Sequence, residues 1–418
     1  MGGHAMARHI SACRVPGGPP RMGRMTITES THVRAGLLAF VAAGTVANLY
    51  YSQPILASLA ASLSTSASRA ALVVVATLIG NGLAQSLLVP LADLVERRRL
   101  TQALLAVQAA AMLVMALCNQ LVIAVAASVA VGLGGAAAMV LLPYAAALTP
   151  PQQRGRSTGV VMSGVLLGIL FSRSISGFIS TAFDWRVTYL AGAVLTVAAA
   201  ILLSAFPPSR AVRPPSGYTR LLASVARLAA RDRFVQRRML IGALGFVSFN
   251  LLWTGLTLRL SEPPYRFTDL TIGLFGLIGL AGALVAKNTG AWFDHGHGAL
   301  VSRIGWAATA TAWAVSVASD GGGLAGVAVV ILAVALLDAG MQAQHITNQS
   351  ALITARPTQT ARVTTAYMSA NVLAGAVGST LASALYPAHG WNALAALGLA
   401  CSATALLVLL TGRPRHQA

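Results

Sequence analysis

The stretch LADLVERRR, residues 91–99, places five charged side chains between two long apolar runs. The run before it spans about residues 70–91 and the run after it about residues 100–118. Each can supply the roughly 20 apolar residues that cross a bilayer as a helix, and neither alternates with period two as a barrel strand would. The stretch is therefore predicted to be a loop between two membrane-spanning helices.

Apolar runs of this kind recur through the whole chain. Hydrophobic residues make up 56% of the 418 residues and charged residues only 9%, whereas soluble proteins carry roughly a quarter charged residues. The twelve runs lie at about 35–60, 70–91, 100–118, 121–145, 158–182, 187–206, 239–260, 270–288, 302–318, 324–347, 362–385 and 391–411. The composition excludes a soluble protein and predicts an all-α integral membrane protein with twelve transmembrane helices.

The distribution of basic residues predicts the orientation of these helices. If the N-terminus is cytoplasmic, 24 of the 29 Lys and Arg residues fall in cytoplasmic segments and only Arg69, Arg186, Arg259 and Arg266 fall outside. Basic residues concentrate on the cytoplasmic side of membrane proteins. We therefore expect both termini to be cytoplasmic. The formal net charge of +19 then reflects topology and attraction to anionic lipids at the cytoplasmic face, not nucleic-acid binding.

The chain is predicted to divide into two halves. Residues 1–33 are a basic, disordered tail without a secretory signal, and Met25 is a second plausible start. Residues 34–206 and 239–411 form six-helix bundles, 412–418 form a tail, and 207–238 form a basic linker with an amphipathic helix on the inner leaflet. Identical pairs 206 positions apart support an internal repeat; they are Arg156 and Arg362, Met162 and Met368, Ser163 and Ser369, and Trp185 and Trp391. The bundles are thus expected to be pseudo-symmetric.

Several motifs resemble those of the major facilitator superfamily over about residues 34–411. They are Leu91–Arg99, Arg154–Arg156, Asp184–Arg186, Gly290–Asp294 and, as in the bacterial drug–proton antiporters, Asn48–Pro54. The resemblance implies a transporter of the bacterial inner membrane that works by rocking-bundle alternating access. The sequence departs from the antiporter pattern at Val89, where Gly is usual, and at Ser128, where Arg is usual. The fifth run also lacks the usual Pro.

The loop motif and its echo in the second half are predicted to be gating elements. An acid at a helix end can face the N-terminus of a helix in the other bundle, where backbone N–H groups point outward. Asp93 would then meet the start of span eleven near Arg362, and Asp294 would meet the start of span five near Arg156. The alternative is that these acids are solvated loop residues beside bases.

Ionisable side chains inside membrane spans are costly and are candidates for function. The one acid in a span is Asp338 in span ten, and Gln342 and His345 follow at i+4 and i+7 on the same helix face. Asp338 and His345 are predicted to carry protons, and Gln342 is predicted to bind substrate. The alternative for Asp338 is a structural pairing between helices.

Further candidates for substrate binding are Arg173, the one base inside a span, and three residues of spans one and seven. Arg173 can bind an anionic group, or it can snorkel outward or pair with Asp184. The other candidates are Asn48, Tyr51 and Asn250, because amides beside aromatic rings suit an amphiphilic ligand, although amides also join helices.

No catalytic, nucleotide-binding or metal-binding motif is found in the sequence. We therefore expect neither an enzyme nor a metal or other cofactor, and the proton gradient is the expected energy source. The leading hypothesis is proton-coupled export of a small amphiphilic organic compound by a monomer. The alternatives are uptake of a small metabolite by proton symport and a non-transporting sensor on the same fold.

Overall fold

Helices cover all twelve apolar runs in the computed structural model, which describes residues 27–209 and 217–411. These ranges contain no strand. The first half comprises α1 (Ile27–Ala47), α2 (Leu56–Ser62), α3 (Ala67–Ala70), α4 (Leu72–Leu87), η1 (Pro90–Asp93), α5 (Arg97–Leu117), α6 (Leu121–Gly135), α7 (Ala137–Ala147), η2 (Pro151–Gln153), α8 (Arg154–Ala182) and α9 (Trp185–Ser204). The linker holds α10 (Tyr218–Arg231), and the second half comprises α11 (Arg233–Ser261), α12 (Asp269–Leu274), η3 (Phe275–Gly279), α13 (Leu280–Trp292), η4 (Phe293–His297), α14 (Gly298–Ser316), η5 (Val317–Gly321), α15 (Gly323–Ala355), η6 (Pro357–Gln359) and α16 (Thr360–Leu410).

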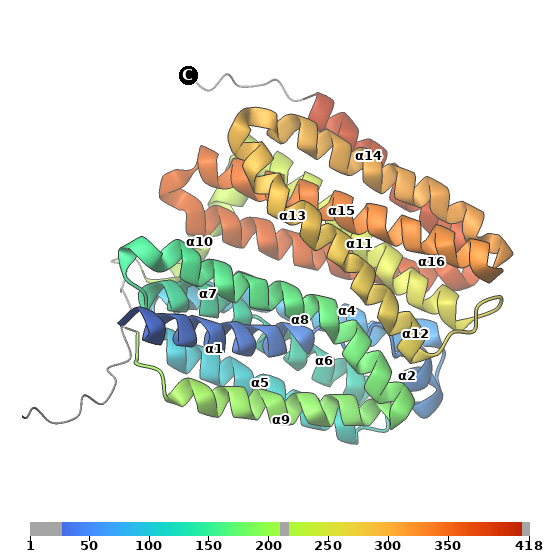
Figure 1. Ribbon diagram of the computed structural model, residues 1–418, viewed down its shortest axis with the longest axis horizontal. Coiled ribbons are helices and arrows are strands. Elements are labelled where there is room, and N and C mark those ends of the chain that lie inside the picture. The colour runs from blue at the N-terminus through green and yellow to red at the C-terminus, as the bar shows by residue number, and fades with distance from the viewer. Residues whose placement is uncertain (1–26, 210–216, 412–418) are drawn as a thin grey trace, which may run out of the picture.

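The two halves lie side by side as two bundles of long, roughly antiparallel helices (Figure 1). Eight helical segments of the described residues are long and apolar enough to cross a membrane, and 33–47 and 269–279 form shorter apolar helices. We call the end of the bundles at which α10 lies the linker end. The other end, with α2, α3 and the start of α12, is called the opposite end. The predicted fold class, an all-α membrane protein of two bundles, is confirmed.

The internal repeat is visible in the helix boundaries. In the first half, η2 begins at Pro151, α8 at Arg154 and α9 at Trp185. Shifting these positions by 206 residues gives Pro357, Thr360 and Trp391, where η6, α16 and the second part of α16 begin. Two matching turns and four matching helices support the predicted pseudo-symmetry of the bundles.

Two helix boundaries differ from the predicted spans. Spans eleven and twelve form one helix in name, α16, but Gly390 breaks it with φ 68° and ψ −167°. A residue with a side chain rarely adopts a positive φ, so Gly is the residue that allows this sharp reversal. In span one the helix stops at Ala47, and residues 48–55 form turns before α2 begins at Leu56. Pro54 in this segment cannot donate a backbone hydrogen bond.

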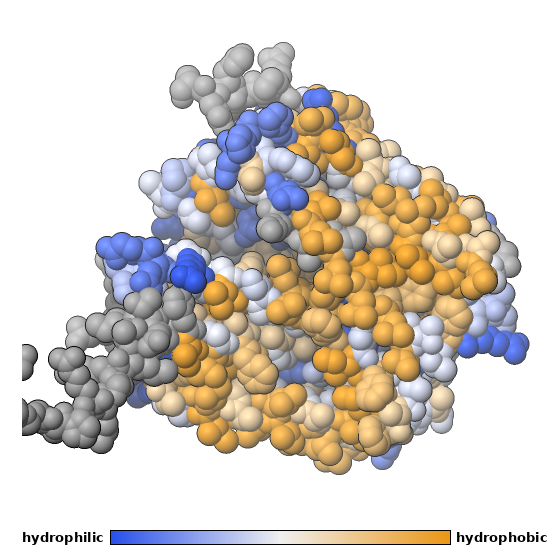
Figure 2. All heavy atoms as spheres, viewed as in Figure 1, coloured by the Kyte–Doolittle hydropathy of each residue, from blue (hydrophilic) through white to orange (hydrophobic). Residues whose placement is uncertain are grey.

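The outer surface of the bundles carries large apolar side chains. Figure 2 shows a broad hydrophobic area across the helices, with hydrophilic residues gathered towards the two ends. Examples that are more than half exposed are Leu117, Phe178, Ile201, Leu284 and Leu407. Soluble monomers rarely expose contiguous apolar patches larger than a few hundred Å². The surface is therefore that of a protein whose helices contact lipid hydrocarbon.

The linker helix α10 packs against the protein at the linker end. Leu228 contacts the apolar cluster of Val235, Leu352, Val363 and Tyr367 in the second bundle. At its start, the Tyr218 hydroxyl donates a hydrogen bond to the Leu87 carbonyl of the first bundle (2.6 Å). The apolar face of α10, which was predicted to rest on the lipid leaflet, is therefore partly buried against the protein. Leu228 contacts the second bundle and Tyr218 contacts the first.

An ion pair fixes the junction between α10 and α11. Asp232 accepts backbone hydrogen bonds from Phe234 (2.9 Å) and Val235 (3.3 Å), and Nη2 of Arg356 donates to its Oδ2 (2.7 Å). Partial burial raises the pKa of the Asp232 carboxyl group, but the Arg356 guanidinium and the backbone donors outweigh burial and hold that pKa below its usual value. Asp232 therefore stays ionised and ties the start of α11 to the end of α15.

The predicted tails lie largely outside the described residues. Of the predicted N-terminal tail, residues 27–33 already belong to α1, so the helix begins earlier than residue 34. Residues 1–26, residues 210–216 of the linker and the tail 412–418 are not described.

Candidate functional site

Arg173 in α8 is buried between the two bundles and is 3% exposed. Its Nε donates a hydrogen bond to Oε1 of Gln53 in the turn between α1 and α2 (2.7 Å). Its guanidinium lies 4.0 Å from the ring centroid of Trp253 in α11 and 5.1 Å from that of Tyr50. Nη2 is buried without a hydrogen-bond partner. A buried donor without a partner is costly. A ligand that supplies an acceptor to Nη2 would therefore gain a favourable hydrogen bond.

Asp338 in α15 lies beside the same tryptophan and is 6% exposed. The Trp253 Nε1–H donates a hydrogen bond to Oδ1 of Asp338 (3.3 Å). A Cβ atom at Gly279 would lie 3.0 Å from Oδ2, so the absence of a side chain there leaves room for the carboxyl group. Asp338 and Arg173 attract each other electrostatically, but the described contacts include no direct ion pair between them.

We call Tyr50, Gln53, Arg173, Trp253 and Asp338 the central cluster. Two of its elements, the α1–α2 turn and α8, belong to the first bundle, and the other two, α11 and α15, belong to the second. The sequence singled out Arg173 and Asp338 but not the three residues that hold them together. A ligand bound here would contact both bundles, which is the arrangement that rocking-bundle transport requires.

Asp338, Gln342 and His345 were predicted to share one face of the helix. Gln342 lies on the same side as Asp338, but His345 does not. A Cβ atom at Gly282 of α13 would lie 3.1 Å from Cγ of Gln342, so Gln342 faces α13 as Asp338 does. His345 is turned instead towards α11 and α16. Its ring stacks on Tyr367 (centroids 5.5 Å apart), its Nδ1 is 3.2 Å from the Tyr367 hydroxyl, and Phe246 contacts its edge.

The structure does not bring Asn48, Tyr51 and Asn250 into the central cluster. Nδ2 of Asn48 donates to Oγ1 of Thr196 in α9 (2.9 Å), within the first bundle. Tyr51 is 6% exposed and belongs to an apolar cluster of that bundle. Asn250 donates to the Phe246 carbonyl of its own helix (3.0 Å) and lies against α16. In this structure the three side chains pack between helices, and their role in substrate binding remains a prediction.

Arg173 lies inside the protein and away from Asp184. Arg173 does not snorkel outward, since it is buried, and it does not pair with Asp184. Asp184 caps α9 by accepting a hydrogen bond from the Arg186 backbone (2.8 Å) and lies 3.9 Å from the Arg186 guanidinium.

The two bundles are in contact at the opposite end. Oδ2 of Asp269, at the start of α12, accepts hydrogen bonds from Ser58 of α2 (2.5 Å) and Ser180 of α8 (2.6 Å). The Leu270 backbone N–H donates to Oγ1 of Thr181 (3.0 Å). An apolar cluster that includes Leu59, Val75, Leu258, Val372 and Ala376 also spans both bundles. The opposite end is therefore closed.

The predicted gating residues at the linker end are apart. Asp93 forms an ion pair with Arg97 of its own loop (3.4 Å), not with Arg362, and its side chain is 48% exposed. Asp294, Arg156 and Arg362 are all exposed. Among the described residues, no ion pair joins Asp93 or Asp294 to the facing bundle. The expected gating contacts are thus absent from a structure whose opposite end is closed.

Comparison with known proteins identifies the family. The profile of the Major Facilitator Superfamily matches residues 37–379. The chain is 33% identical over 373 residues to the uncharacterized transporter YgaY of Escherichia coli O157:H7, covering 89% of this chain and 94% of that protein. It is 26% identical over 260 residues to Multidrug resistance protein D of Escherichia coli strain K12, covering 62% and 64% of the two chains. The crystal structure of a mutant of the nucleoside transporter NupG has the same fold, with a TM-score of 0.73 at 10% identity, covering 91% of this chain and 98% of that one.

The chain belongs to the Major Facilitator Superfamily. It is therefore a multi-pass membrane protein and a secondary transporter, a class whose members move solutes and are not enzymes. The resemblance seen in its sequence motifs is confirmed.

Gly177 provides a test of whether the closed opposite end is one of two states. A side chain at this position of α8 would overlap the Asp269 carbonyl of α12, which belongs to the other bundle. We expect Gly177→Val to disfavour the closed opposite end by about 1–3 kcal/mol of overpacking, which shifts the two-state ratio by about 5- to 150-fold. The readout is labelling of Leu258→Cys by a membrane-impermeant maleimide, in a chain without its native cysteines. Leu258 is 1% exposed and belongs to the apolar cluster at the opposite end. Gly177→Val should therefore increase its labelling.

Gly159 of the same helix is the matched control. A Cβ atom there meets no atom within 4 Å, so Gly159→Val should leave labelling unchanged. Equal labelling of both variants would show that α8 and α12 do not separate.

Proposed function

We propose that this protein is a proton-coupled exporter of a small amphiphilic organic compound, which binds at the central cluster. The observation that carries this proposal is the pair of buried, opposite charges, Arg173 and Asp338, held by Trp253 between the two bundles. Isolated charges within a membrane span are costly and mark pathways for substrate or protons. The rings of Tyr50 and Trp253 offer apolar surface for the rest of the ligand.

The charged groups would act at different steps. Asp338 would bind a proton and release it, and Gln342 one turn away would offer a further hydrogen bond to the ligand. Arg173 would bind a polar or anionic group through Nη2, which has no partner in the described structure. His345 contacts Tyr367 and lies one turn nearer the linker end than Gln342, so its role would be to pass protons towards Asp338.

Alternating access would exchange the contacts at the two ends. The opposite end is closed by Asp269 and its serine partners. When it opens, the linker end would close, and Asp93 would reach the start of span eleven near Arg362 while Asp294 would reach the start of span five near Arg156. Helix N-termini favour such carboxylates. The proton gradient would supply the energy without a cofactor.

The proposed setting is a bacterial inner membrane with the linker end in the cytoplasm. The concentration of basic residues at that end supports this orientation and a contact with anionic lipids. Similarity to Multidrug resistance protein D supports export. The proposed partners are protons, a small-molecule substrate and lipid, and the protein would act as a monomer.

A second candidate, uptake of an organic anion by proton symport, is favoured by Nη2 of Arg173. Protonation of Asp338 would remove the charge that competes for Arg173, so an anion and a proton would bind together. In export by antiport, by contrast, the substrate and the proton would compete for Asp338.

The proposal is tested by accumulation assays in energised cells that lack their own efflux pumps. A panel of dyes, antibiotics and organic acids is compared between cells with and without the protein, before and after a protonophore. Reduced accumulation that the protonophore abolishes supports export. Increased accumulation that the protonophore abolishes supports symport. If no compound in the panel responds, the protein is a narrow transporter or a sensor, and broad export is wrong.

A further inference from the structure

A groove of about 510 Å³ lies between α13 and α14 and has α15 as its floor. The floor residues Ala339, Gly340 and Ala343 lie on a different face of α15 from Asp338, since neighbouring helical residues point about 100° apart. The groove is therefore separate from the central cluster, and no step of the proposed transport cycle uses it.

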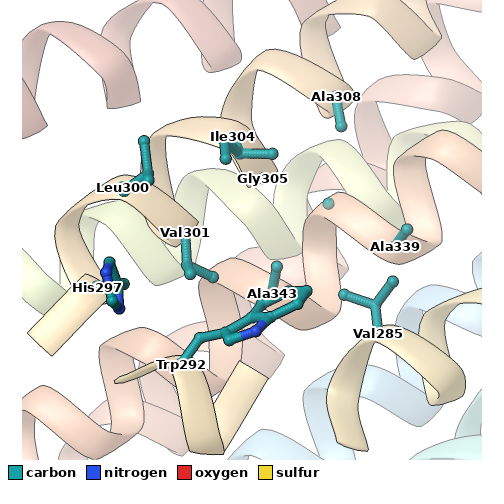
Figure 3. Close-up of a pocket in the computed structure, with 11 residues that line it drawn as sticks. Val285, Trp292, His297, Leu300, Val301, Ile304, Gly305, Ala308, Ala339 and Ala343 are labelled. Carbon is teal, nitrogen blue, oxygen red and sulfur yellow. The ribbon is translucent and has the colours of Figure 1, made fainter. Parts of the chain in front are cut away.

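The groove is apolar and has small residues at its base. Val285 and Trp292 form the α13 wall, Leu300 and Ile304 form the α14 wall, and Ala339 and Ala343 come from α15 (Figure 3). At Gly340 the backbones of α14 and α15 approach so closely that a Cβ atom would overlap the Gly305 carbonyl. Beside this contact, Ala339 and Ala343 carry only methyl groups, and the space above them is within the range of small-molecule sites, roughly 300–1,000 Å³.

The groove continues the lipid-facing surface. Leu300 and Ile304, which line one wall, are 53% and 58% exposed, and Leu284 of the neighbouring helix α13 is 69% exposed. These residues belong to helices that the family places in the bilayer, so hydrocarbon chains reach the mouth of the groove. An apolar space open to hydrocarbon is filled by hydrocarbon and not by water.

One end of the groove is polar. Figure 3 shows His297 at this end and Ala308 and Val285 towards the other. The corner from residue 293 to residue 303 contains His295, His297 and Arg303 against a single acid, Asp294. This corner lies at the linker end, and its basic residues attract anionic head groups.

We infer that the groove binds one acyl chain of an anionic phospholipid, with the head group at the His297 corner. The apolar walls hold the chain, and the basic corner selects the head group. Trp292, 47% exposed beside His297, has the amphipathic ring that favours the membrane interface. The inference concerns a lipid site and does not depend on the direction or substrate of transport.

Native mass spectrometry of the full-length protein in mild detergent tests this site with phosphatidylglycerol and phosphatidylcholine as probes. We expect one phosphatidylglycerol to be retained with an affinity about tenfold above that of phosphatidylcholine, or about 1.4 kcal/mol. Ala308→Phe fills the groove and should reduce this binding about tenfold. Ala343→Leu fills it from the floor and serves if the first variant does not fold.

Ala307→Phe is the matched control, because Ala307 is exposed on the same helix but does not line the groove. It should bind phosphatidylglycerol as the unmodified protein does. His297→Ala should lower the preference for phosphatidylglycerol without removing the lipid. Equal binding by Ala308→Phe, Ala343→Leu and the control would overturn the site. Displacement of the lipid by a transported compound would instead assign the groove to substrate.

Discussion

Replacing Asp338 with Asn is expected to abolish transport driven by the proton gradient while leaving exchange of substrate across the membrane. Asn has nearly the same shape as Asp and can still accept the hydrogen bond from Trp253, but it cannot bind or release a proton. A transporter without its proton-binding group can still alternate between its two states, because a bound substrate suffices for exchange. Net transport against a gradient would be lost, because nothing couples the cycle to protons.

The same variant should remove the pH dependence of substrate binding, and the sign of that dependence distinguishes the two candidate functions. For the unmodified protein we expect the dissociation constant to change by about 5- to 150-fold between pH 5.5 and 8.5, the range of typical coupling energies. Tighter binding at low pH means that proton and substrate bind together, as in symport. Tighter binding at high pH means that they compete, as in export by antiport.

Asp184→Asn is the control for this experiment. Asp184 is half-exposed, caps α9 and lies at the opposite end, and Asn is an equally good capping residue. Its pH profile should match that of the unmodified protein. If Asp338→Asn retains full gradient-driven transport, the coupling role of Asp338 is wrong and His345 becomes the next candidate.

The fold could be predicted because membrane helices leave a strong pattern in the sequence. Twelve apolar runs and the pairs at an offset of 206 residues identified the two bundles, and the helix boundaries follow the same offset. The linker helix was also visible as a periodic pattern. The partner of its apolar face could not be predicted, because such a face can pack against lipid or against protein. In the structure it packs partly against the bundles.

The faces of the helices could not be predicted in span one. The prediction for Asn48 and Tyr51 rests on amides beside aromatic rings and not on which face they occupy, and α1 ends at Ala47 before turns follow. Helical periodicity does not extend through such a segment. The neighbouring residues Tyr50 and Gln53 are the ones that contact Arg173.

One signal in the sequence could have placed the central cluster. Away from their ends, the predicted spans contain a single base, Arg173, and a single acid, Asp338. Two lone opposite charges in hydrocarbon are expected to lie near each other, since each lowers the cost of burying the other. Considering them together would have brought α8 and α15 to the same place between the bundles.

The gating contacts could not be tested for a different reason. A sequence is compatible with every state of a two-state protein, and one structure shows one of them. In this structure Asp93 contacts Arg97 of its own loop and not the facing bundle. The predicted contact of Asp93 with the start of span eleven therefore remains a prediction for the other state.

Replacing Arg173 with Gln is expected to weaken substrate binding by about 10- to 150-fold, the loss of one or more hydrogen bonds to a charged group at about 1.5–3 kcal/mol each. Gln can still donate to Gln53 but has no positive charge for the ligand or for Asp338. Binding by calorimetry and exchange in proteoliposomes measure the effect. Arg173→Lys should recover part of the affinity, because the charge remains while the planar guanidinium is lost.

The double variant Arg173→Gln/Asp338→Asn separates binding from charge balance. If Arg173 only offsets the buried charge of Asp338, removing both charges should restore stability and exchange together, since Asp338→Asn alone retains exchange. If Arg173 binds the substrate, the double variant should recover the melting temperature lost by Arg173→Gln while exchange stays low. We expect the second result, because Nη2 of Arg173 is buried without a partner and the described contacts include no direct ion pair between Arg173 and Asp338. The coupling energy from this double-mutant cycle gives the share of each role.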